Sequence, residues 1–273
     1  MIKKKINKNI KDISKNLETL SFKPLGLGLN GLMGISLFFF YYARFSKNEQ
    51  YSELADNLLE KVLAKVPYNV TYFFSAEFVD IGRTISFLAN EKFLEVETNE
   101  FTGYFEEPLI LRMRQDVGTN FSFYTGITGI CDFFLNRKNQ EEALDIIIRH
   151  LCSGLRVKGY PKHPIEPLFL FPSEVLRDVK IFLFKLKKEG ISFPQKELLN
   201  DAIRKFEFKK VLHSNCPEYS VLQDLREAEI ISDQQKIQSS LETVATTSSD
   251  LIFKGLASLS LADNSLPAWW KLV

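Results

Sequence analysis

Residues 31–40 read Gly-Leu-Met-Gly-Ile-Ser-Leu-Phe-Phe-Phe, and residues 126–135 repeat the theme as Gly-Ile-Thr-Gly-Ile-Cys-Asp-Phe-Phe-Leu. Each stretch places two small residues three positions apart and follows them with a dense apolar run. Small residues at this spacing share one face of a helix and let another backbone approach closely. The apolar run predicts a helix that is buried nearly all round. A chain that repeats such helices indicates a repeat architecture rather than a bundle with one amphipathic layer.

Copies of the pattern with weaker sequence agreement occur around Gly82, Ser173, Leu222 and Gly255. Most successive copies are roughly 45–50 residues apart, which is the length of two helices with their loops. Between the copies, amphipathic patterns predict half-buried helices over 51–66, 139–151, 195–206 and 233–245. Buried helices that alternate with half-buried ones favour an inner and an outer layer. We therefore predict an all-α chain, an α/α toroid (barrel) of about six helical-pair repeats.

The remaining segments fit a single domain over residues 1–273. An N-terminal amphipathic helix is expected over 1–20, because apolar residues recur at helical spacing from Ile6 to Leu20 between solvated lysines. Prolines, Pro108 among them, are expected between helices. The segment 153–171 contains three of them and is followed by Pro172, so we expect it to form a Pro-rich loop over one mouth of the toroid.

The composition excludes several classes of protein. A net charge of +1 offers no electrostatic case for a nucleic-acid partner or an acidic membrane surface. The longest apolar run, from Ile35 to Ala43, is too short to span a membrane, and the N-terminus lacks the apolar core of a signal peptide. Three cysteines at long spacings make no disulfide framework. We expect a cytoplasmic protein.

Three stretches of the chain resemble a known family. They are residues 28–44, the sequence Tyr124-Thr-Gly-Ile-Thr-Gly-Ile, and the end from Asp250 to Trp269-Trp-Lys-Leu. Together they resemble the first, a middle and the last repeat of lanthionine synthetase C-like proteins, the cyclases of lanthipeptide biosynthesis. The resemblance spans almost the whole chain but is poor from about residue 160 to 245. It implies an α/α toroid that acts in the maturation of a ribosomally synthesised peptide.

The same resemblance implies a zinc ion, held by two cysteines and one histidine, that activates the substrate thiol. This chain departs from the family there, because it contains no Cys-His-Gly and no Trp-Cys-x-Gly. In its second half, His213 and Cys216 are the neighbouring residues that offer metal ligands. Zinc needs a third protein ligand beside them, and the sequence identifies none. We predict no cofactor, with His213 and Cys216 as the candidates should zinc bind.

Several predicted inner helices carry charges where an all-round buried helix should not. A buried charge is costly unless it is paired or hydrated. The central cavity of a toroid is hydrated, so these residues are expected to line a polar pocket, together with two polar residues at equivalent positions. The alternative is that they pair as structural ion pairs or face solvent. The candidates are Asn30, Glu77, Asp80, Arg83, Tyr124, Glu174, Arg177, Asp224 and Lys254.

Three functions follow from these features. The first is a zinc-free pseudoenzyme that binds a precursor peptide or a peptide-modifying enzyme. The second is a zinc-independent cyclase that adds a thiol to a dehydro-residue, with Glu77, Asp80 or Tyr124 as base and Arg83, Arg177 or Lys254 stabilising the enolate. The third is an α/α-toroid glycoside hydrolase with Glu77 and Glu174 as its carboxylates.

Overall fold

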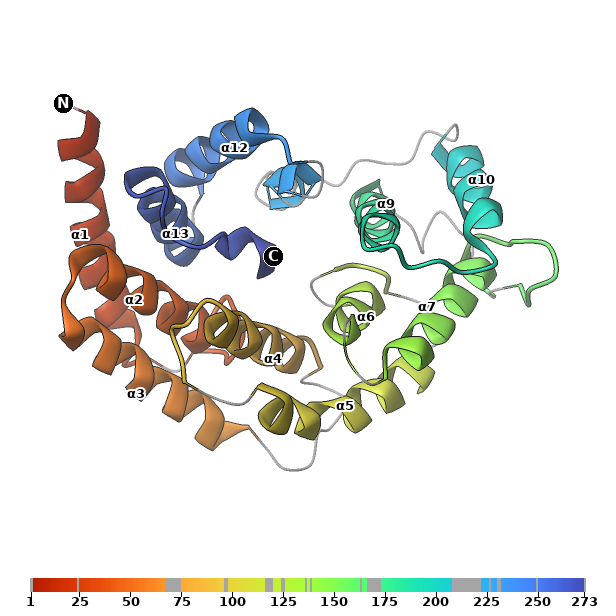
Figure 1. Cartoon of the computed structure of the whole chain (residues 1–273), viewed down its shortest axis with the longest axis horizontal. Coiled ribbons are helices and arrows are strands. Elements are labelled where there is room, and N and C mark those ends of the chain that lie inside the picture. The colour runs from red at the N-terminus through yellow and green to blue at the C-terminus, as the bar shows by residue number, and fades with distance from the viewer. Residues whose placement is uncertain are drawn as a thin grey trace. The chain divides into compact units, whose positions relative to one another are not determined.

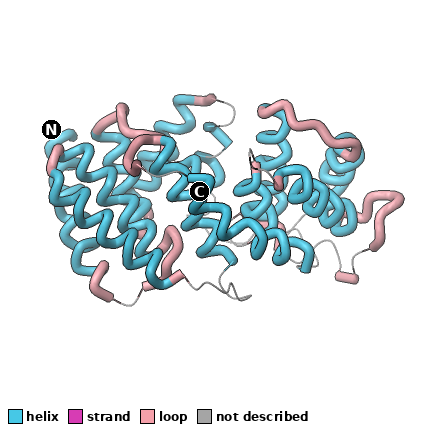
Figure 2. The backbone as a smooth tube through the Cα atoms, turned by 60° about the horizontal axis from the view of Figure 1, so that its bottom comes forward, coloured by secondary structure: helices cyan, strands magenta, loops and turns pink. Residues whose placement is uncertain are grey.

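The computed structural model is helical wherever it is described, and Figure 2 shows helices joined by loops without a strand in those residues. This confirms the predicted all-α class. None of the described helices is long and apolar enough to cross a membrane. The structure describes residues 2–23, 25–66, 75–95, 98–115, 120–123, 126–135, 137, 139–162, 164–165, 173–207, 222–225, 227–229, 232–248 and 250–272.

The chain divides into two compact units, Met1–Thr102 with Asp224–Val273, and Gly103–Gln223. We call them unit 1 and unit 2. The single domain predicted from the sequence, and its closure into a toroid, stay predictions. Unit 1 contains α1 (Ile2–Leu20), α2 (Leu32–Ser46), α3 (Glu49–Lys65), α4 (Ser75–Asn90), α12 (Gln234–Thr247), α13 (Leu251–Ala262) and the short 3₁₀ helix η2 (Trp269–Leu272). Most of α5 (Thr98–Gln115) belongs to unit 2, with α6 (Ile127–Phe134), α7 (Gln140–Gly154), α9 (Ser173–Lys188) and α10 (Lys196–Glu207).

Unit 1 is built around the buried helices α2 and α13, which pack on each other (Figure 1). Every residue of α2 from Leu32 to Ala43 is buried, as the apolar run predicts. The amphipathic helices α1, α3 and α12 cover this pair. In α1 the buried residues Ile10, Ile13 and Leu17 lie at helical spacing, which confirms the predicted N-terminal amphipathic helix. Buried helices flanked by amphipathic ones are therefore present in this unit.

The C-terminal segment packs on the same core. The Tyr41 hydroxyl in α2 donates a hydrogen bond to the Pro267 carbonyl oxygen at 2.9 Å. The Trp269 ring is fully buried and stacks on Phe253 of α13, with ring centroids 5.8 Å apart. These aromatic contacts tie the last residues of the chain to its first buried helix.

Unit 2 repeats the arrangement on a smaller scale. All eight residues of α6 are buried, and α6 packs against α7 and α9. The predicted stripe of α7 is confirmed, since Ala143, Ile146, Ile147 and Leu151 are buried. Helix α7 continues to Gly154, so the expected Pro-rich loop over 153–171 begins later than predicted. Part of that loop, residues 163 and 166–171, lies outside the described residues.

The position expected for Pro108 is wrong, because this residue lies inside α5 and not between helices. A proline in a helix costs about 3 kcal/mol, since it removes one backbone hydrogen bond and crowds the preceding turn. On either side of it, Phe105 and Leu109 are buried. The burial of two large apolar side chains is worth about as much as the proline costs, which explains why the helix continues through it.

Candidate functional site

A glycine-rich loop over residues 26–31 precedes α2, and two carboxylates of α4 bind its backbone. The amide N–H of Leu27 donates to Glu77 Oε1 at 3.1 Å, and the amide N–H of Leu29 donates to Asp80 Oδ2 at 3.2 Å. A loop before a helix has backbone donors without helical partners, so carboxylates that accept from them stabilise its conformation. Glu77 and Asp80 therefore hold the loop in place.

The loop lies so close to α2 that only glycine fits at position 34. A Cβ atom added to Gly34 would lie 1.8 Å from the carbonyl oxygen of Leu29. The loop closes through the N–H of Leu32, which donates to the Gly26 carbonyl oxygen at 2.9 Å. The second small residue of the sequence pattern thus admits the chain's own loop, and Ile252 of α13 also lies 3.2 Å from the added Cβ.

Unit 2 contains the same arrangement of loop, glycine and carboxylate before α6. The N–H of Phe123 donates to Asp178 Oδ2 of α9 at 2.8 Å, and the N–H of Ile127 donates to the Asn120 carbonyl oxygen at 3.0 Å. A Cβ atom on Gly129 would lie 1.8 Å from the carbonyl oxygen of Phe123. In both units a carboxylate from a later helix therefore binds the loop, and a glycine lets that loop pack on the buried helix. The internal repeat seen in the sequence is also a repeat of these contacts.

The two equivalent carboxylates, Asp80 and Asp178, differ in their surroundings. Burial raises the pKa of Asp80 to about 6, against the lowering effects of the Leu29 amide and of Arg83, while Glu77 raises the pKa further. Asp178 is fully buried, and its second oxygen accepts from Gln223 Nε2 at 3.0 Å. With this pKa, Asp80 changes its charge close to neutral pH, as general acids and bases in active sites do.

The other predicted pocket residues are distributed over both units. Asn30 is exposed on the loop of unit 1, and Arg83 is buried next to Asp80. Asp224 Oδ1 lies 3.7 Å from Lys236 Nζ. This is a structural ion pair, the alternative to a pocket position that the sequence left open. The structure thus brings Asn30, Glu77, Asp80 and Arg83 to one place, while Asp224 pairs elsewhere. Lys254 is half-buried in the first turn of α13, and Arg177 is half-buried in α9 of unit 2. Tyr124 and the side chain of Glu174 lie outside the described residues.

The described cysteines do not fit a zinc site. Cys131 and Cys152 are both fully buried, and burial raises the pKa of the Cys131 thiol well above its ordinary value and that of Cys152 to about 11. Zinc binds thiolates, which both environments disfavour. The described part of the chain contains no group of three or more His, Cys, Asp or Glu residues that could hold a metal ion. His213 and Cys216 lie outside the described residues, so a zinc site there is untested.

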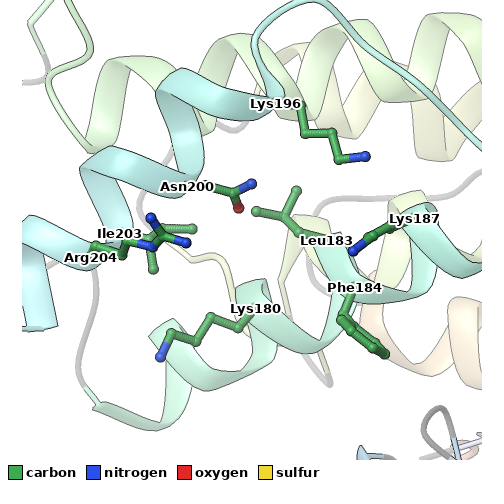
Figure 3. A pocket seen from close by; sticks show the side chains of 8 residues that line it. All are labelled: Lys180, Leu183, Phe184, Lys187, Lys196, Asn200, Ile203 and Arg204. Carbon is green, nitrogen blue, oxygen red and sulfur yellow. The ribbon is translucent and has the colours of Figure 1, made fainter.

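A pocket of about 300 Å³, which was not predicted from the sequence, lies between α9 and α10 in unit 2 (Figure 3). Its described lining includes four cationic side chains and no acidic one. Apolar side chains and one amide complete it. The eight lining residues are Lys180, Leu183, Phe184, Lys187, Lys196, Asn200, Ile203 and Arg204. A concave site with apolar and convergent polar groups is the usual form of a ligand-binding pocket.

A signal for this pocket was present in the sequence. On α9, Lys180, Leu183 and Lys187 recur at i, i+3 and i+7, a spacing that places them on one helix face. On α10, Lys196 and Arg204 share a face in the same way. Each stripe mixes lysine or arginine with apolar residues, so the sequence predicts only an ordinary amphipathic helix there. Only the folded arrangement, in which both stripes line one common space, distinguishes these two helix faces from solvent-exposed ones.

No family model, curated protein or solved structure matches this chain.

Proposed function

We propose that this chain is a lanthionine synthetase C-like α/α toroid that binds a precursor peptide, or a peptide-modifying enzyme, in the maturation of a ribosomally synthesised peptide. It would act in the cytoplasm and without zinc. One observation carries the proposal. The two motif copies on which the resemblance rests, around Gly34 and Gly129, fold into the same loop, glycine and carboxylate arrangement in two separate units.

A binding role is favoured over zinc chemistry by the ligand atoms of the described residues. The two thiols there are buried in their neutral form, and the carboxylates of Glu77, Asp80 and Asp178 accept hydrogen bonds from backbone amides. A carboxylate that accepts a backbone hydrogen bond stabilises the fold, and this use requires no substrate. These groups therefore support a framework that presents a surface.

The binding proposal is tested with the full chain and a displayed library of random linear peptides. We expect the selection to enrich peptide sequences that also bind the free protein in solution. An unrelated all-helical protein of similar charge is the control. Enrichment no greater than on this control would contradict the proposal.

The zinc content of the chain, purified without chelator or affinity tag, tests the zinc-free part separately. We expect far less than one zinc ion per chain. About one ion per chain, lost on mutation of His213 or Cys216, would return zinc chemistry to first place.

A second function, zinc-independent addition of a thiol to a dehydro-residue, is favoured by the pKa of Asp80. A carboxylate with a pKa of about 6 is able to take the thiol proton near neutral pH, and Arg83 beside it would stabilise the enolate that forms. The probe is a synthetic peptide that contains one cysteine and one dehydroalanine. Its free thiol is counted by mass spectrometry after treatment with N-ethylmaleimide. Loss of thiol at the same rate with wild type, Asp80→Asn and buffer would exclude this function.

A further inference from the structure

The pocket between α9 and α10 gathers positive charge around an apolar centre. Lys180 and Lys187 come from α9, and Lys196 and Arg204 come from α10, with Leu183 and Ile203 between them (Figure 3). These two apolar side chains are buried. The charges therefore surround a floor that favours an apolar group.

The cations of the pocket are available to a ligand in different degrees. Lys187 and Arg204 are exposed, and Lys196 is half-buried. Arg204 also lies 4.0 Å from Asp201, but both side chains are more than 60% exposed, and such a pair is worth little in water. Lys185, one turn from the pocket, is engaged by Asp132 at 2.7 Å and does not line it. The pocket thus keeps an excess of positive charge.

The spacing of the cations selects the shape of the ligand. Lys180 and Lys187 are seven residues apart, which is about 10 Å along a helix, and Lys196 and Arg204 are about 12 Å apart. A single phosphate group reaches one end of such a pocket only. Two carboxylates four residues apart in an extended peptide lie on the same face of the chain and span about 13 Å, with an apolar side chain between them on that face. An acidic peptide segment matches both the charge and the length.

We propose that the pocket between α9 and α10 binds an acidic, partly apolar segment of a peptide. The occupant carries two or more carboxylates that pair with Lys187, Lys196 and Arg204, and an apolar side chain that covers Leu183 and Ile203. This inference rests on the proposed peptide-binding function and assigns it a place and a ligand chemistry. The exposed ring of Phe184, 45% accessible, extends the apolar contact at one side.

Fluorescence anisotropy tests the proposal with a labelled peptide in which two glutamates are separated by serine, leucine and serine, so that both glutamates and the leucine share one face of the extended chain. Saturable binding is expected, weakened by an increase in NaCl from about 50 to about 300 mM because salt screens exposed charges. The same peptide with glutamine in place of glutamate should bind at least tenfold more weakly. Equal binding of the glutamate and glutamine peptides would overturn the proposal. Displacement of the peptide by millimolar inorganic phosphate would identify a small-anion site and would overturn it as well.

Two neighbouring lysines of α9 provide a matched pair of variants. Lys187 lines the pocket, whereas Lys188 does not, and both are exposed in the last turn of the helix. Lys187→Ala should weaken binding about two- to fivefold, the range of one exposed charge pair. Lys188→Ala has the same net charge as Lys187→Ala and should change the affinity for the peptide less than twofold. Equal effects of both variants would show only a general attraction by charge, and the proposed site would be wrong.

A charge reversal separates this proposal from the proposed function. Lys187→Glu combined with Arg204→Glu should weaken binding of the acidic peptide more than tenfold, since repulsion replaces attraction. The thermal unfolding of this variant by circular dichroism checks that it is folded. If peptides enriched from the random library bind the folded double variant as they bind wild type, peptide binding stands and the pocket is not its site. If the library yields no binders while the acidic peptide binds and depends on Lys187, the pocket stands and the broader function fails.

Discussion

The substitution Gly34→Ala tests the packing of the glycine loop against α2 most directly. The added Cβ would lie 1.8 Å from the Leu29 carbonyl oxygen, where a normal contact is about 3.5 Å, so the loop must retreat by roughly 1.5 Å. Such a movement would break the hydrogen bond of 3.2 Å between the Leu29 N–H and Asp80. Overpacking costs about 1–3 kcal/mol, and the lost hydrogen bond costs about 1–3 kcal/mol more. Alanine in a helix returns about 1 kcal/mol, which leaves a net loss of about 1–5 kcal/mol.

Urea unfolding followed by far-ultraviolet circular dichroism measures this loss as a lower midpoint at an unchanged slope. Tryptophan fluorescence gives a second readout that reports on unit 1, because Trp269 and Trp270 both belong to it. Gly103→Ala is the control, since Gly103 lies inside α5 with nothing within 4 Å of an added Cβ. It should stabilise the chain by about 0.5–1 kcal/mol. A midpoint for Gly34→Ala at or above that of wild type would refute the packing described here.

Three further tests concern the carboxylates. Asp178→Ala leaves the buried N–H of Phe123 without its acceptor and should cost about 2–4 kcal/mol, whereas Asp178→Asn keeps an acceptor and should cost less; equal losses in urea unfolding would contradict this. Lys185→Met removes the ion pair between Lys185 and the Asp132 carboxylate, which is 5% exposed. The free energy of unfolding should fall by about 1–3 kcal/mol, a range discounted because Lys185 is 32% exposed. Adding Asp132→Asn to this variant should recover most of the loss. The raised pKa of Asp80, about 6 against 3.8, contributes stability that is present below about pH 4 and is lost as pH rises through 6, because the folded state holds the proton more tightly. Asp80→Asn should therefore gain stability relative to wild type between about pH 4 and pH 7, and a pH-independent difference in urea midpoint would count against it.

The helices of this chain were predictable because their signal is local. The buried run of α2 and the stripe of α7 both follow from residues three and four positions apart. Pro108 marks the limit of this reasoning. A local rule ends a helix there, while the buried neighbours Phe105 and Leu109, whose packing depends on the rest of the unit, keep it intact.

The candidate site was predicted less well because its contacts join distant parts of the chain. The sequence marked Glu77 and Asp80 as charges in a buried helix and predicted a polar pocket for them. Their observed partners are backbone amides about fifty residues earlier, and a backbone amide leaves no trace in the sequence. The basic pocket escaped for the same reason, since Lys187 and Arg204 become neighbours of one cavity only when α9 and α10 fold.

The use of charge in the two units bears on where recognition takes place. Carboxylates in both units bind the chain's own loops, so their negative charge serves the framework. The cations around the α9–α10 pocket surround a space. That segment falls within residues 160–245, where the proposed resemblance to lanthionine synthetase C-like proteins is weakest. A protein that keeps the framework contacts and changes one segment would alter its ligand and not its fold, so the specificity of the proposed peptide binding is best sought on the facing surfaces of α9 and α10.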